Sequence, residues 1–200
     1  MTRAAREGRL RVRARRDLLI TDDWLLAMIE AFADHDTPPG SHAGAAWEQA
    51  GRNWGEAWYL GLQAEAATHS CTAEDLDLDD LLWLVEDELA RGGWGRANFD
   101  LDSFAEAGII LATVRGGPAS DRHEAGAGEV AEILAGFVAG VLGRVSDVPM
   151  RGVGICRTVG GATVAAVAAA HADRVAAVRQ ELGRGAAWLE ALSRAGGAGG

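Results

Sequence analysis

Apolar positions recur every three or four residues over four long stretches of the chain, the spacing typical of helices that bury one face. The stretches cover about residues 21–36, 43–66, 72–91 and 128–146. The last is apolar on most sides, so we expect it to be the buried helix of the core. Thr21, Thr72 and Asp173 are the predicted capping residues of the first, third and final helices.

Two of these predicted helices carry a stripe of small residues. Gly51 and Gly55 stand four residues apart in the second helix, and Gly136 and Gly140 do so in the fourth. Such a stripe lets another backbone approach closely. It therefore marks tight helix packing, either within the chain or between copies of it.

The period changes to two at residues 97–101, where Ala97, Phe99 and Leu101 alternate with polar residues. A turn near 105–108 leads to the β-rich run 109–114, which predicts a hairpin. A second hairpin is predicted from 153–156 and 163–170, with its turn at Gly160 and Gly161.

The alanine-rich residues 163–182 could instead form one helix, because alanine favours helix. Val164 and Val167 favour a strand as far as about His171, followed by a last helix and a short amphipathic turn near Trp188. The expected fold class is therefore α+β, an antiparallel sheet of two hairpins backed by helices.

Length and composition fit one compact domain: 200 residues, 48% of them apolar and 24% charged. We assign residues 17–194 to this domain, 1–16 to a basic flexible arm and 195–200 to a flexible tail. The arm holds seven arginines and one acid, against 12 arginines and 28 acids in the rest of the chain. It is interpreted as a solvated tail or as a tether for an anion or a nucleic acid.

The net charge of −10 argues against nucleic acid as the main partner, since phosphate binding depends on clustered cations. No apolar run has the 18 or more residues of a membrane span, and no signal-peptide core follows the basic start. Cys71 and Cys156 are the only cysteines and are expected as free thiols. We therefore expect a cytoplasmic protein without a membrane span.

Candidate chemistry is sparse. The five histidines show neither the spacing of a catalytic triad nor that of a paired metal site. His69 and Cys71 flank one residue, but two ligands do not make a zinc site. The acids between 74 and 88 are interpreted as a solvated helix face. We expect no enzyme, metal or cofactor, and the seven tryptophans form core or interface, or the walls of an apolar ligand pocket.

Several short motifs, taken in order, resemble the 4-vinyl reductase domain. They are Ala50–Gly55 in a helix, Gly92–Arg96 entering a strand, Leu134–Leu142 in the buried helix, and Cys156 followed by Gly160. The likeness covers about residues 18–192. It implies an α/β module related in fold to the small subunits of the TRAPP tethering complex, and a homodimeric ligand-binding or scaffolding domain with an apolar cavity.

The sequence departs from that family at its polar positions. Val153, Val164 and Ala131 stand where the family has an acid and two cysteines. Of these four polar positions of the family, Cys156 alone keeps its polar residue. A single thiolate does not hold a metal ion. The resemblance therefore implies that any metal site of the family has been lost here.

A weaker similarity is to the accessory D-type component of bacterial cellulose synthase, which is a structural oligomer. It rests on Cys71–Thr72, Gly93–Gly95 and Gly143–Arg144. The leading hypothesis is a non-enzymatic sensor or adaptor that binds an apolar small molecule or lipid as a homodimer. The expected lining residues are Phe99, Phe137, Val141 and Cys156. The alternative is a structural oligomeric component of a larger assembly, whose glycine stripes pack between copies.

Overall fold

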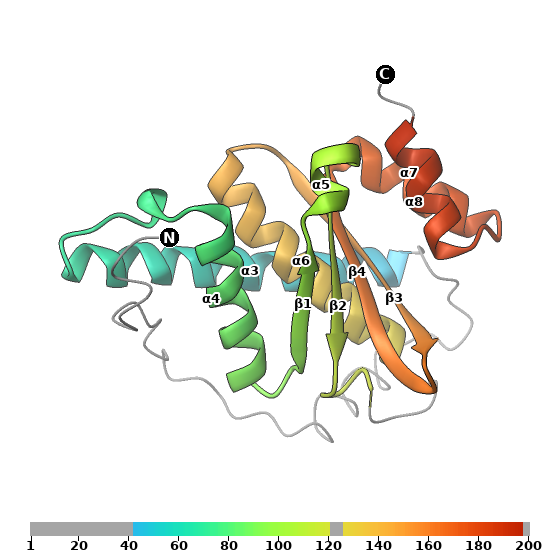
Figure 1. Cartoon of the computed structure of the whole chain (residues 1–200), viewed down its shortest axis with the longest axis horizontal. Helices are drawn as coiled ribbons and strands as arrows, with labels where there is room; N and C mark the ends of the chain where they lie inside the picture. Colours follow the sequence, from blue (N-terminus) through green and yellow to red (C-terminus); the bar gives the residue numbers. More distant parts are fainter. Residues whose placement is uncertain (1–41, 121–125, 198–200) are drawn as a thin grey trace.

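The computed structural model describes residues 42–120 and 126–197. The basic arm and the predicted helix at 21–36 lie outside these residues. The described elements run from helix to sheet and back to helix, as Figure 1 shows. In chain order they are α3 (His42–Thr68), a 3-10 turn (Ala73–Asp75), α4 (Leu78–Arg91), β1 (Arg96–Asp100), α5 (Asp102–Ala107), β2 (Ile109–Arg115), α6 (Ala127–Ser146), β3 (Met150–Val159), β4 (Ala162–His171), α7 (Ala172–Gly183) and α8 (Trp188–Gly197).

The four strands form one antiparallel sheet in the order β1-β2-β4-β3, which confirms the predicted α+β class and both antiparallel strand pairs. Gly160 and Gly161 both have positive φ, 59° and 82°, as a two-residue turn between paired strands requires. β4 is a strand despite its alanines, because it is central in the sheet and buried on both faces.

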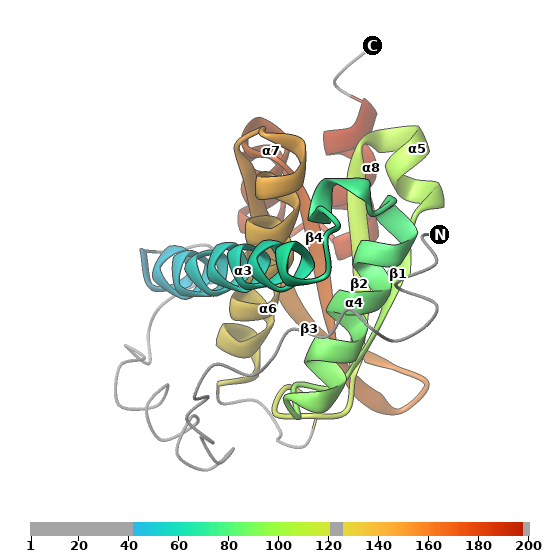
Figure 2. The ribbon, with the colours of Figure 1, turned by 90° about the vertical axis from the view of Figure 1, so that its left-hand side faces the viewer.

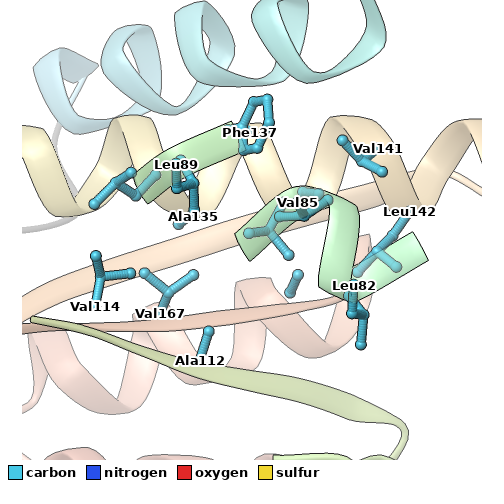
Figure 3. Packing of buried hydrophobic residues seen from close by; sticks show 14 of the residues in the cluster. Leu82, Val85, Leu89, Ala112, Val114, Ala135, Phe137, Val141, Leu142 and Val167 are labelled. Carbon is cyan, nitrogen blue, oxygen red and sulfur yellow. The ribbon is translucent and has the colours of Figure 1, made fainter. Parts of the chain in front are cut away.

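Helices cover both faces of the sheet. α4 and α6 lie on one face, with their buried side chains packed on Ala112, Val114 and Val167 (Figure 3). α7 and α8 pack on the other face, against alternate residues of the same strands. α3 lies outside α6 and crosses it, as Figures 1 and 2 show. Among the described residues, none of the helices combines the length and apolar character needed to cross a membrane.

The glycine stripes of α3 and α6 face each other within one chain. A Cβ atom added at Gly51 would lie 2.0 Å from the carbonyl oxygen of Ile133, and one added at Gly136 would lie 2.0 Å from that of Glu48. Gly55 and Gly140 repeat this relation one turn later, at 2.1 Å and 2.3 Å from carbonyl oxygens of the facing helix. The stripes therefore form an internal helix crossing rather than a surface for another copy.

Four predicted boundaries need correction. Thr72 and Asp75 cap a separate 3-10 turn, and Asp77 caps α4 by accepting a hydrogen bond from the Asp80 N–H at 2.8 Å. The extended residue Leu76 separates the two elements.

The N-cap of α7 is His171, whose ring accepts from the Asp173 N–H, so Asp173 lies in the first turn. The predicted turn near 105–108 is part of helix α5, which ends at Gly108 with φ 62°. The predicted tail begins inside α8, because Ala195 is buried against the second core cluster.

Candidate functional site

The four predicted lining residues share one face of the sheet but not one site. Phe137 and Val141 lie one turn apart on α6 and are 0% and 1% exposed. Phe137 points from α6 toward α3 (Figure 3), where its ring centroid is 4.0 Å from that of Trp54. Both side chains are therefore part of a filled core between helices.

Phe99 and Cys156 lie on the two opposite edge strands of the sheet. Phe99 pairs with Ala112, and through β4 this row ends at Gly154, two residues before Cys156 on β3. Three strand spacings of about 4.8 Å separate the two edges by roughly 14 Å. Phe99 and Cys156 are thus too far apart to contact the same small chemical group of a ligand.

Cys156 lies at the end of a close contact between α6 and β3. Added Cβ atoms at Gly152 and Gly154 would lie 2.3 Å and 2.0 Å from the carbonyl oxygens of Ala135 and Ala131. Two residues after Gly154 on β3, the Cys156 thiol donates a hydrogen bond at 2.9 Å to the carbonyl of Ala127, which lies one turn before Ala131 on α6. Burial, and secondarily the nearby charge of Glu129, raise the pKa of Cys156 to about 11. The thiol is therefore protonated and acts as a donor at neutral pH.

This pKa predicts how Cys156 responds to pH. The thiolate fraction at pH 7.5 is very small, so alkylation of Cys156 by iodoacetamide in the folded protein is expected to be slow and to accelerate up to about pH 11. Because the pKa of Cys156 is higher in the folded than in the unfolded state, the folded state keeps this proton to a higher pH. Stability is therefore expected to fall as pH rises from about 9 to about 11. Mass spectrometry of the labelled peptide measures the rate. Fast labelling at pH 7.5 would contradict the assigned environment.

The positions that the family resemblance assigns to a metal do not converge. Val153 belongs to the cluster beneath α7 and α8, whereas Cys156 and Ala131 belong to the cluster beneath α6. His69 and Cys71 also turn to separate partners: the His69 ring lies 3.3 Å from Glu65, and the Cys71 thiol donates to the Ala66 carbonyl at 3.3 Å. Within the described ranges, no three His, Cys, Asp or Glu residues are grouped as metal ligands would be.

Sequence patterns did not predict the two buried carboxylates on the outer edge of β3. Glu48 of α3 is fully buried and accepts from Arg151 at 3.1 Å and 2.6 Å, and from the Gly152 N–H at 3.1 Å. Glu132 of α6 accepts from Arg179 at 2.7 Å and 2.6 Å. It also accepts from the Gly154 N–H, while Arg179 donates to the Gly152 carbonyl at 2.9 Å.

These contacts satisfy three backbone groups of the edge strand β3: the N–H groups of Gly152 and Gly154 and the carbonyl of Gly152. Burial raises the pKa of Glu132, with the bidentate contact to Arg179 acting in the opposite direction. At the other edge, burial raises the pKa of Glu86, whose carboxylate accepts from the Phe99 N–H. Carboxylates of three helices thus accept backbone hydrogen bonds from both edge strands of the sheet, which is a structural role.

An open groove of about 380 Å³ lies where α3 crosses α6. It is lined by Arg52 and Glu56 of α3, by Ala139, Gly140, Gly143 and Arg144 of α6, and by Asp147, Val148, Pro149 and Met150 of the α6–β3 connection. The apolar residues and charged residues are about equally represented. None of the four predicted lining residues contributes to this groove, although Phe137 and Val141 belong to the helix that forms one wall.

The charged side chains of the groove differ in their pairing. Arg144 donates to Glu56 at 3.1 Å. The Nε atom of Arg52 lies 3.9 Å from Glu48, beyond hydrogen-bond distance, and is buried without a hydrogen-bond partner. Arg52 does donate from Nη2 to Gln49. Its guanidinium therefore has only this long ion pair with Glu48 and makes no hydrogen bond to a carboxylate, since Arg151 and the Gly152 N–H already occupy Glu48.

Comparison with known proteins yields no family model that matches this chain and no curated protein that is similar to it.

Proposed function

We propose that the chain is a non-enzymatic sensor or adaptor module that binds a small molecule in the groove between α3 and α6 and acts as a homodimer. The observation that carries this proposal is the groove itself. Its volume of about 380 Å³ falls within the roughly 300–1,000 Å³ of small-molecule sites. Four apolar and four charged residues line it together, a combination that can hold a ligand body and orient its polar end.

The groove supports ligand binding better than the core does. The core around Phe137 is filled by aromatic side chains, with Trp58 in edge-to-face contact at 5.9 Å. A ligand there would have to displace close-packed side chains, whereas the groove is already open. We therefore assign the proposed ligand site to the groove between α3 and α6, and not to the four residues expected from the sequence.

The non-enzymatic part of the proposal rests on the state of the ionisable groups. The Cys156 thiol is protonated at neutral pH, so it is a poor nucleophile. The buried Glu48 and Glu132 are each held by an arginine and by one backbone N–H group, and so are not placed as general bases. The family resemblance points in the same direction.

The alternative of a structural oligomer loses its main argument, because the glycine stripes of α3 and α6 pack on each other within one chain. Self-association needs a different surface. Trp83 of α4 and Leu60 of α3 are 45% and 47% exposed, and large apolar side chains are favoured at interfaces. Light scattering of the purified protein is expected to give twice the 20.9 kDa of the chain.

The test of the proposed function fills the groove. A Cβ atom added at Gly143 would be 3.4 Å from the Val148 carbonyl oxygen, so the helix tolerates a side chain there. Gly143→Phe is expected to fill the groove and to abolish the thermal shifts that hits from a metabolite library produce with the unmodified protein. The measurement is differential scanning fluorimetry of the full chain, with isothermal titration of each hit.

The matched control is Gly128→Phe on the same helix, where an added Cβ atom meets nothing within 4 Å. It lies about 22 Å along the helix from Gly143. Hits that persist in Gly143→Phe, or a library without hits, would contradict the proposal.

A further inference from the structure

The arginines around Glu48 outnumber the carboxylates that contact them. Arg151 makes two hydrogen bonds to Glu48, whose Oε1 also accepts from the Gly152 N–H. These bonds occupy the carboxylate, so Arg52 remains at 3.9 Å. One buried carboxylate is therefore shared by two guanidinium groups, and Arg52 has the longer and weaker of the two ion pairs.

Arg52 is placed to offer this charge to a ligand. Its side chain is 25% exposed, so it is partly withdrawn from water, and it lines the groove. Its one hydrogen bond goes to the neutral amide of Gln49. A guanidinium that is partly desolvated and makes no hydrogen bond to an anion gains more from binding an oxyanion than a fully solvated one does.

Two acids also line the groove, and they differ in their pairing and in their position. Glu56 is paired with Arg144. Asp147 ends α6, whereas the backbone carbonyl of Arg52 contacts Gly140, seven residues earlier. Seven residues correspond to about 10 Å along a helix. The backbone of Arg52 and Asp147 thus lie toward different ends of the groove, and Ala139 and Met150 are among the apolar residues that line it.

On the basis of the proposed function, we infer that the groove binds an amphiphilic small molecule whose oxyanion group, a carboxylate or a phosphate, is held by the guanidinium of Arg52. The apolar body of the ligand would lie along Ala139, Val148 and Met150. Arg52 is the specificity-determining residue of this site, because it makes the groove prefer an anion to a neutral molecule of the same shape.

The test uses three probes that share one body: 4-phenylbutyrate, 4-phenylbutanamide and 4-phenylbutylamine. Isothermal titration of the full chain is expected to show about tenfold tighter binding of the carboxylate than of the amide, the effect of a hydrogen bond to a charged group. 4-Phenylbutyl phosphate, as a fourth arm, distinguishes the two oxyanions. Tighter binding of either oxyanion than of the amide supports the inference.

Arg52→Gln is expected to remove the preference, so that acid and amide bind equally, and Arg52→Lys is expected to retain it in part. Arg96→Gln, an exposed position on β1, is the control and leaves the preference unchanged. Circular dichroism confirms that each variant is folded. Equal binding of acid and amide by the unmodified protein, or binding of none of the probes, overturns the inference. Library hits that Gly143→Phe blocks would leave the proposed function standing in that case.

Discussion

Replacing Gly136 with alanine is expected to lower the free energy of unfolding by at least about 3 kcal/mol, at the upper end of overpacking effects. The added methyl group would lie 2.0 Å from the carbonyl oxygen of Glu48 and 2.8 Å from the backbone N of Arg52. Relief requires a shift of α3 or α6 as a whole, since the obstructing atoms are backbone. Urea unfolding followed by tryptophan fluorescence measures the change.

The position of α6 explains why this effect is large. On one side α6 contacts α3 at Gly136, and on the other it contacts β3 at Gly152 and Gly154. A helix held closely on two sides cannot move away from an added methyl group without opening the second contact.

Gly128→Ala is the matched control, because it lies on the same helix in open space. It is expected to be neutral or to stabilise the protein by up to about 1 kcal/mol, the difference in helix propensity between the two residues. Equal unfolding midpoints for Gly136→Ala and Gly128→Ala would show that α3 and α6 are further apart than the structure places them.

Removing the carboxylate of Glu48 is expected to cost about 3–5 kcal/mol, as for other broken buried ion pairs. Glu48→Ala would leave Arg151 and the Gly152 N–H without their acceptor. It would also uncover the first half of the β3 edge, and we expect the variant to aggregate more readily during refolding. Chemical unfolding and light scattering measure the two effects.

Two further variants separate charge from packing. Glu190→Ala removes an exposed partner of Arg194 and is expected to change stability by less than about 1 kcal/mol. The double variant Glu48→Met with Arg151→Met replaces both charges and is expected to recover much of the lost stability. If Glu48→Ala and Glu190→Ala destabilise the protein equally, the buried pair is not the structural element described above.

Sequence periodicity was sufficient to predict the described elements that are long and regular. The stripe of apolar residues located α6 to within a residue or two, and the alternation at residues 97–101 located β1. The glycine pair at 160–161 defined the second hairpin because positive φ is easy only for glycine. The first residues of α4 and α7 were predicted wrongly, because several nearby residues can cap a helix and packing selects among them.

Candidate lining residues were harder to predict. Phe137 and Val141 lie on the helix that was correctly expected to be buried, but periodicity does not reveal whether a buried position faces a cavity or a filled core. Arg52 carried no signal at all, because its importance depends on Arg151, which is 99 residues away in sequence and competes for the same carboxylate.

The sequence by itself determined the α+β class, the sheet of two strand pairs and the buried helix, because each follows from the spacing of apolar side chains along a short segment. Only the tertiary structure decided that the two glycine stripes meet each other, that carboxylates contact the sheet edges and that Arg52 makes no hydrogen bond to a carboxylate. These features depend on distances between segments far apart in the chain, which local patterns do not contain.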